Sequence, residues 1–182
     1  VFLGHEFRTD MFMLDISYDS CKLVGMSDNQ EKSLLRIAST TLLEALKKAV
    51  SLELDIDYNE MNGGWLPRKE GDLLHIEMFF YDSLTSGAGY SSMIASILDG
   101  VLKRAHAILS NCTCSRSCKN CLDNFYNQRN HEFFDRNLGL QLLEYAETGL
   151  VPDDYSLEEQ KEYLSPLKHL ICDTERVSEK EI

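Results

Sequence analysis

Four of the six cysteines in this 182-residue chain lie within ten residues of one another. We call this segment, residues 112–121, the knuckle. Its cysteines are Cys112, Cys114, Cys118 and Cys121, and they are separated by one, three and two residues. Thiolates are soft ligands that suit Zn²⁺, and four of them complete a tetrahedral site at about 2.3 Å per bond. Because four protein ligands leave no open coordination position, the spacing predicts a structural zinc site rather than a catalytic one.

The same cysteines leave two other interpretations open. An iron–sulfur cluster uses the same ligands, and spacing alone does not exclude it. Free or disulfide-bonded cysteines are the second alternative. No export signal is visible in the sequence, so we expect a reducing, cytoplasmic location, where clustered cysteines more often bind metal. Cys21 and Cys172 stand apart and are interpreted as small buried hydrophobic residues.

Basic residues gather around the knuckle in a chain that is otherwise acidic. The net charge of −12 argues against a free-standing nucleic-acid-binding protein. Residues 101–131, in contrast, carry five basic residues and one acidic residue, Asp123. Phe125 and Tyr126 could stack on bases, but packing against the knuckle is the favoured interpretation. The candidates for contact with a phosphate backbone, weighed equally against a solvated loop, are Arg116, Lys119 and Arg129.

Two further candidate sites have weaker support. Four acidic residues near predicted strands could form a divalent-metal nuclease or phosphodiesterase site, although no motif spacing supports it. These residues are Asp10, Glu60, Glu77 and Asp82. Ser86–Gly89 precedes a predicted helix and could bind an anion, but a tight strand-to-helix turn is the favoured interpretation. The sequence has no Walker A motif, so we expect no ATP hydrolysis by this chain.

Hydrophobic spacing predicts the elements that position these residues. Strands are predicted at residues 6–17, 54–59 and 73–81. Helices are predicted at residues 29–53, 87–110, 131–147 and 156–169. The first helix has one apolar stripe, while Asn62-Gly63-Gly64 is interpreted as a break and Pro67 as part of a loop. The order indicates an α+β domain with a small antiparallel or mixed sheet, flanked by long helices, and with the knuckle between two helices.

Length and composition indicate one globular domain with a small appendage. Hydrophobic residues make up 43% of the chain, and only 3 prolines occur, which excludes a disordered or collagen-like chain. We predict a domain over residues 1–149 and an acidic C-terminal helix and tail over residues 150–182. No apolar run is long enough to span a membrane, so no membrane partner is expected. Because residue 1 is valine, we expect a fragment of a longer protein or a processed product.

The amino-acid sequence around the knuckle resembles that of a known family. Residues 81–90 read YDSLTSGAGY, residues 121–128 read CLDNFYNQ, and His131 and Asp135-Arg136 follow. Together with the opening residues 4–10, this resembles the DUF1998 family, also called the MrfA zinc-binding (MZB) domain, over residues 4–147. The family often has glycine before the third cysteine and proline after it. This chain has Ser117 and Lys119 there, a departure that concerns loop geometry rather than the ligands.

The resemblance implies a cofactor, a context and partners. Domains of this family lie at or near the C-terminus of superfamily 2 DNA helicases and their partners, including a DNA-repair helicase and the DISARM and Druantia antiphage systems. In the family the four cysteines hold zinc, and the ATPase motifs lie in other domains. We therefore predict a non-catalytic zinc-binding accessory domain that engages helicase domains or another subunit of the same system, and DNA. The alternatives are the nuclease described above or an acidic module that docks on a basic partner.

Overall fold

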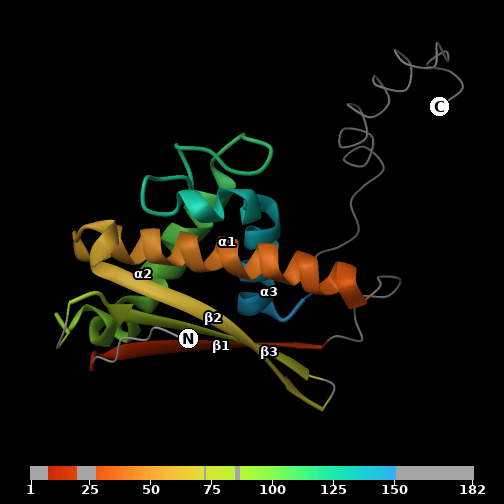
Figure 1. Cartoon of the computed structure of the whole chain (residues 1–182), viewed down its shortest axis with the longest axis horizontal. Coiled ribbons are helices and arrows are strands. Elements are labelled where there is room, and N and C mark those ends of the chain that lie inside the picture. The colour runs from red at the N-terminus through yellow and green to blue at the C-terminus, as the bar shows by residue number, and fades with distance from the viewer. Residues whose placement is uncertain (1–7, 20–27, 72, 85–86, 151–182) are drawn as a thin grey trace, which may run out of the picture. The chain divides into compact units, whose positions relative to one another are not determined.

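The computed structural model describes residues 8–19, 28–71, 73–84 and 87–150, which form a small sheet covered by helices (Figure 1). The elements in chain order are β1 (Met11–Asp19), α1 (Asp28–Leu54), β2 (Met61–Glu70), β3 (Leu73–Asp82), α2 (Tyr90–Ser110) and α3 (Arg136–Thr148). Short 3-10 segments at Tyr58–Glu60 and Gln128–Phe133 precede β2 and α3. The predicted α+β class is therefore confirmed.

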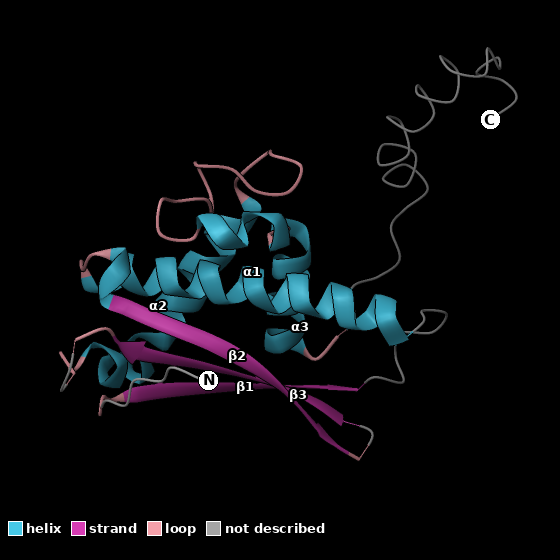
Figure 2. Ribbon diagram, viewed as in Figure 1, coloured by secondary structure: helices cyan, strands magenta, loops and turns pink. Residues whose placement is uncertain are grey.

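The sheet is antiparallel, with β3 between β1 and β2 (Figure 2). Alternate residues of β3, including Ile76, Met78 and Phe80, are buried under the helices. The intervening residues of β3 face away from the helices and are only half-buried. The sheet therefore has one face in the core and one open face among the described residues.

The position of β2 differs from the predicted one. Residues 54–59, predicted as a strand, form the end of α1 and the start of a 3-10 turn. Gly63 and Gly64, interpreted as a break, lie inside β2. Glycine is needed at residue 64, because a Cβ there would lie 2.5 Å from the ring of Phe79 on the neighbouring strand. Pro67 is tolerated because β2 is an edge strand, which pairs only with β3 in the part of the chain that the structure describes. Glycine here permits close approach of two strands rather than a turn.

The middle of helix α1 is buried on all sides, rather than along the single stripe that its sequence suggests. Every residue from 41 to 47 is buried, because α1 packs against the sheet on one side and against α2 and α3 on others. Glu44 and Lys47 lie in this run and are 5% and 8% exposed. Charged groups at that depth need hydrogen-bonding partners. Tyr58 contacts both side chains, and the loop that follows the knuckle supplies Asn127 to Glu44.

The third predicted helix divides into two parts. Residues 128–133 form a 3-10 segment, and the α-helix begins only at Arg136. Asp135 interrupts the two because its backbone is extended and its side chain accepts hydrogen bonds from the backbone N–H groups of Asn137 and Leu138. Gly149 ends the helix in a left-handed conformation with φ of 68°, as its position in the sequence predicts.

Some predictions lie outside the described residues. They concern the helix at residues 156–169, most of the acidic tail, the start of the first strand, and Cys21 and Cys172. The boundary at residue 149 stays a prediction. Among the helices that the structure describes, none combines the length and the apolar character that crossing a membrane requires.

Candidate metal centre

The knuckle closes the end of α2 and is anchored in the core by its last residues. Asn111 caps α2, and Cys112 follows directly. The carbonyl oxygen of Cys118 accepts hydrogen bonds from the backbone N–H groups of Cys121, Leu122 and Asp123, which fold the chain into a tight turn. Cys121 and Leu122 are each 2% exposed and belong to the hydrophobic core. Burial of one leucine side chain stabilises a fold by about 1.5–3 kcal/mol, so Leu122 anchors the end of the knuckle in the core.

The four sulfur atoms lie at the distances that a tetrahedral zinc site requires. The Sγ atom of Cys112 is 3.5 Å from those of Cys114 and Cys118, and the Sγ atom of Cys121 is 3.7 and 3.8 Å from the same two. A tetrahedron with bonds of about 2.3 Å has edges of about 3.8 Å. All four atoms lie within 4.8 Å of one another, and none of these cysteines forms a disulfide. This compactness favours a single ion over an iron–sulfur cluster, whose irons share the thiolates among several metal centres.

The metal-free thiols differ in acidity because their surroundings differ. Hydrogen bonds with the backbone N–H of Cys114 and with the thiols of Cys114 and Cys118 lower the pKa of Cys112 to about 7. Burial raises the pKa of Cys114 to about 12, and hydrogen bonds to the neighbouring thiols add to the increase. Burial likewise raises the pKa of Cys121. A metal that binds all four sulfurs must therefore displace protons from the buried thiols.

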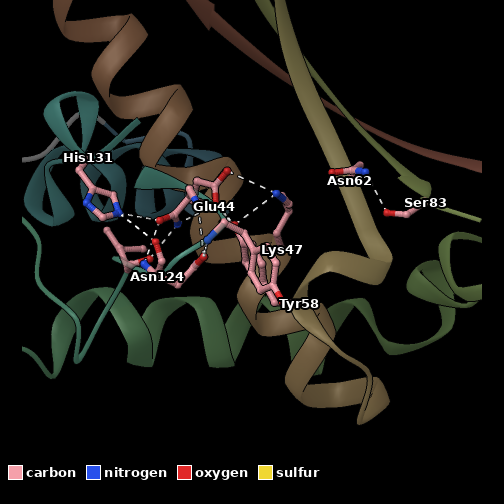
Figure 3. Close-up of polar contacts among 10 residues, drawn as sticks. Glu44, Lys47, Tyr58, Asn62, Ser83, Asn124 and His131 are labelled. Carbon is pink, nitrogen blue, oxygen red and sulfur yellow. Dashed lines mark hydrogen bonds and ion pairs between the residues drawn. The ribbon is translucent and has the colours of Figure 1, made fainter. Parts of the chain in front are cut away.

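A buried polar network joins α1 to the loop that follows the knuckle, residues 122–135 (Figure 3). The Glu44 carboxylate accepts hydrogen bonds from the Tyr58 hydroxyl and, at 3.2 Å, from the Asn127 side-chain amide. Lys47 Nζ lies 3.4 Å from Glu44 Oε1 and 4.6 Å from the centre of the Tyr58 ring. The imidazole Nε2 of His131 lies 2.8 Å from Asn127 Oδ1. The network satisfies the buried charges and holds the loop in one conformation.

Sequence reasoning did not identify this network. Its partners are up to 83 residues apart, and none of them belongs to a recognisable motif. The available signal was the placement of Glu44 and Lys47 in the most apolar part of a long helix, where charged residues need partners.

The structure places all three predicted nucleic-acid residues at the surface. Arg116, Lys119 and Arg129 are exposed. The guanidinium of Arg116 also donates to the carbonyl oxygen of Glu132 at 2.9 Å. Their contact with nucleic acid stays a prediction.

The favoured interpretation of the aromatic residues, packing against the knuckle, is wrong. Phe125 is 78% exposed and Tyr126 is 64% exposed. Their rings meet edge to face at 5.7 Å, and Tyr126 stacks beside Tyr58 at 6.2 Å between ring centres. Asn124 Oδ1 accepts hydrogen bonds from the backbone N–H groups of Tyr126 and Asn127, which turns the chain outward. The loop therefore presents two aromatic side chains to solvent.

The predicted acidic residues do not assemble a metal site. Within the described ranges, the four knuckle cysteines are the only group of three or more potential ligands close enough to share one ion. Asp82 is fully buried, and its carboxylate accepts hydrogen bonds from the backbone N–H groups of Ala88, Gly89, Tyr90 and Ser91 at 2.6–3.2 Å. The backbone N–H groups at the start of α2 thus already bind the Asp82 carboxylate. They are therefore not free to bind an external anion.

The fold and the four clustered thiols define a small zinc-binding α+β domain. Residues 42–122 match the family model of the MrfA Zn-binding domain (MZB). This match includes the whole knuckle. It confirms the resemblance seen in the sequence and the predicted cofactor, Zn²⁺.

The Druantia protein DruE of Escherichia coli (strain UMEA 4076-1) is 40% identical over 172 residues. The alignment covers 92% of this chain but only 9% of that protein, so the chain spans about a tenth of its relative's length. Two crystal structures of the DUF1998 helicase MrfA, one bound to DNA and one to DNA and AMPPNP, are 19% and 18% identical. They cover 65% and 72% of this chain and 15% of MrfA, with TM-scores of 0.47 and 0.43.

Proposed function

We propose that this domain is a non-catalytic, cytoplasmic accessory domain of a DNA helicase or antiphage protein, in which zinc shapes a surface for DNA and for partner domains. The zinc ligands in this proposal are Cys112, Cys114, Cys118 and Cys121. The observation that carries it is the set of four sulfurs within 4.8 Å of one another, inside a segment that matches a zinc-binding family. A site with four protein ligands has no position for substrate, so its role is to fix structure.

The surface proposed for DNA consists of the exposed side chains of the knuckle and of the loop after it. Its members are Arg116, Lys119, Phe125, Tyr126 and Arg129. Basic side chains attract phosphates, and exposed aromatic rings stack on unpaired bases, so this combination suits a single strand. The zinc site and the network around Glu44 hold this surface in place. The local positive charge of Arg116, Lys119 and Arg129 counteracts the net charge of −12 that would otherwise repel nucleic acid.

The open face of the sheet supports a protein partner. Met11 and Met13 of β1 are 54% and 59% exposed, and Leu66 of β2 is 58% exposed. Met11 pairs with Tyr81 and Met13 with Phe79, which places two stacked, half-buried aromatic rings beside the methionines. Contiguous apolar surface of this kind is typical of protein interfaces. We assign it to a helicase domain or another subunit, rather than to DNA.

We expect the double substitution Phe125→Ala, Tyr126→Ala to weaken binding to single-stranded DNA by at least tenfold, because each stacked base contributes about 1–3 kcal/mol. Lys119→Glu and Arg129→Glu should also weaken binding and reduce its salt dependence, since each phosphate contact adds about 0.7 to the slope for single strands. Fluorescence anisotropy with a labelled oligothymidine, at several salt concentrations, measures both effects.

Lys69→Glu is the matched control, because Lys69 is an exposed lysine of the β2 edge strand, far along the chain from the knuckle. This variant should bind DNA as the unaltered chain does, apart from a small effect of net charge. Equal affinities for the aromatic double variant and the unaltered chain would remove these residues from the proposed surface. Absence of any binding at low salt would leave partner engagement as the sole role.

A further inference from the structure

Two cationic side chains from different helices hydrogen-bond to the backbone of the knuckle cysteines. Arg136, the first residue of α3, donates from Nε to the carbonyl oxygen of Cys114 at 2.6 Å. Its Nη1 donates to the carbonyl oxygen of Leu109, in the last turn of α2, at 3.2 Å. Lys48 of α1 donates from Nζ to the carbonyl oxygen of Cys121. Both cations thus touch residues that belong to the proposed ligand set.

The charge of the loaded site explains why cations should lie there. Four thiolates around one divalent ion leave an excess of about two negative charges. Cys121 is buried, and the other three cysteines are only partly exposed, so water screens this charge incompletely. Asp123 adds a further acidic group beside the knuckle, and its Oδ1 is buried without a hydrogen bond among the described residues. The chain as a whole is also strongly acidic. Positive charge near the knuckle must offset the negative charge of the thiolates, of Asp123 and of the chain as a whole.

We infer that Lys48 and Arg136 are positioning residues of the zinc site, which orient the ligand-bearing backbone and compensate the negative charge of the zinc–tetrathiolate complex. This inference rests on the proposed zinc site and adds two residues that lie outside the cysteine motif. Arg136 is well placed to orient the backbone of the knuckle. It joins the carbonyl end of α2, the knuckle and the start of α3, and its own backbone N–H donates to the carbonyl oxygen of Arg116 at 2.8 Å.

A purely structural role would have a different thermodynamic signature. Side chains that only brace the loop stabilise the metal-free and zinc-bound forms equally, and their removal leaves the zinc affinity unchanged. Side chains that compensate the charge of the complex stabilise the zinc-bound form more. Their removal therefore weakens zinc binding, by about 10- to 100-fold for groups that support metal ligands.

The experiment measures zinc dissociation constants by competition with a chelator, for the full chain and for Arg136→Gln, Arg136→Lys, Lys48→Gln and Lys48→Arg. Urea unfolding of the metal-free and zinc-bound forms is measured in parallel. Arg68→Gln is the control for loss of one positive charge, because the Arg68 guanidinium contacts Glu70 and Glu77 on the open face of the sheet. Absorption spectra of the cobalt-substituted proteins report whether four thiolates still coordinate the metal.

We expect both glutamine variants to bind zinc 10- to 100-fold more weakly, with cobalt spectra of unchanged form at saturation. The Arg136→Lys and Lys48→Arg variants should recover most of the affinity, and Arg68→Gln should match the unaltered chain. Unchanged zinc affinity in Arg136→Gln and Lys48→Gln would overturn the inference while leaving the zinc site intact. If the unaltered chain binds no zinc, the proposed function fails, and the inference fails with it.

Discussion

Cys118→Ser is expected to abolish stoichiometric zinc binding and to destabilise the segment between α2 and α3. The Cys118 thiol lies within 3.8 Å of two other sulfurs, so the substitution removes one ligand from the proposed site. The carbonyl oxygen of residue 118, which accepts three backbone hydrogen bonds, is unchanged. Structural zinc contributes about 10–16 kcal/mol to the folding of small zinc domains, so a variant that no longer binds zinc should lose a large part of its stability. Elemental analysis, thiol counting and urea unfolding of the purified chain measure the effect.

The matched control is Cys172→Ser, which makes the same chemical change at a cysteine outside the knuckle. That variant should retain one zinc per chain and release four thiols when the metal is chelated. A Cys118→Ser variant that keeps both its zinc and its stability would contradict the proposed site. Iron in place of zinc would instead select the iron–sulfur alternative.

Zinc affinity should also rise with pH through the neutral range. Burial raises the pKa values of Cys114 and Cys121, so these thiols are protonated in the metal-free form at neutral pH. Zinc binding must release their protons, and mass action then favours the metal-free form as the pH falls. A zinc affinity that does not change with pH would contradict binding by the buried thiols.

The clustering of the four thiols was predictable from sequence because all four cysteines lie within one short segment. The chemistry of thiolates and their spacing suffice, without knowledge of the fold. The α+β class and helices α1 and α2 were likewise predictable, since they depend on local periodicity. The groups that support the knuckle were not predictable. Lys48 and Cys121 are 73 residues apart, and no local pattern indicates that they meet.

In strand β2, tertiary contacts rather than local sequence signals determine the secondary structure. Two adjacent glycines and a proline are typical of a turn, and they led to a predicted break at residues 62–64. The glycines instead make room for the Phe79 ring, and the proline lies on an edge strand. The exposure of Phe125 and Tyr126 was missed for a related reason. It depends on the anchoring of Asn127 to Glu44, a contact that spans 83 residues.

Asp82→Asn is expected to lower the free energy of unfolding at neutral pH by about 2–3 kcal/mol, because hydrogen bonds to a charged group contribute about 1.5–3 kcal/mol. The Asp82 carboxylate accepts four backbone N–H groups at the start of α2, and an amide can satisfy only some of them. Asp99→Asn is the matched control, because Asp99 is an exposed residue in the middle of the same helix. Urea unfolding of both variants measures the difference.

The contribution of Asp82 should depend on pH in a defined direction. Burial acts to raise the pKa of Asp82, but the hydrogen bonds from Ser91, Ala88 and Gly89 outweigh it, so the folded-state pKa lies below the ordinary value. The stabilisation is therefore fully present above the ordinary aspartate pKa and is lost as the pH falls through the folded-state value. The stability difference between the unaltered chain and Asp82→Asn should shrink on acidification, while zinc loss affects both proteins alike. A difference independent of pH would show that the charge of this carboxylate does not hold the helix terminus. Mg²⁺-dependent DNA cleavage that Asp82→Asn abolishes would instead restore the nuclease alternative.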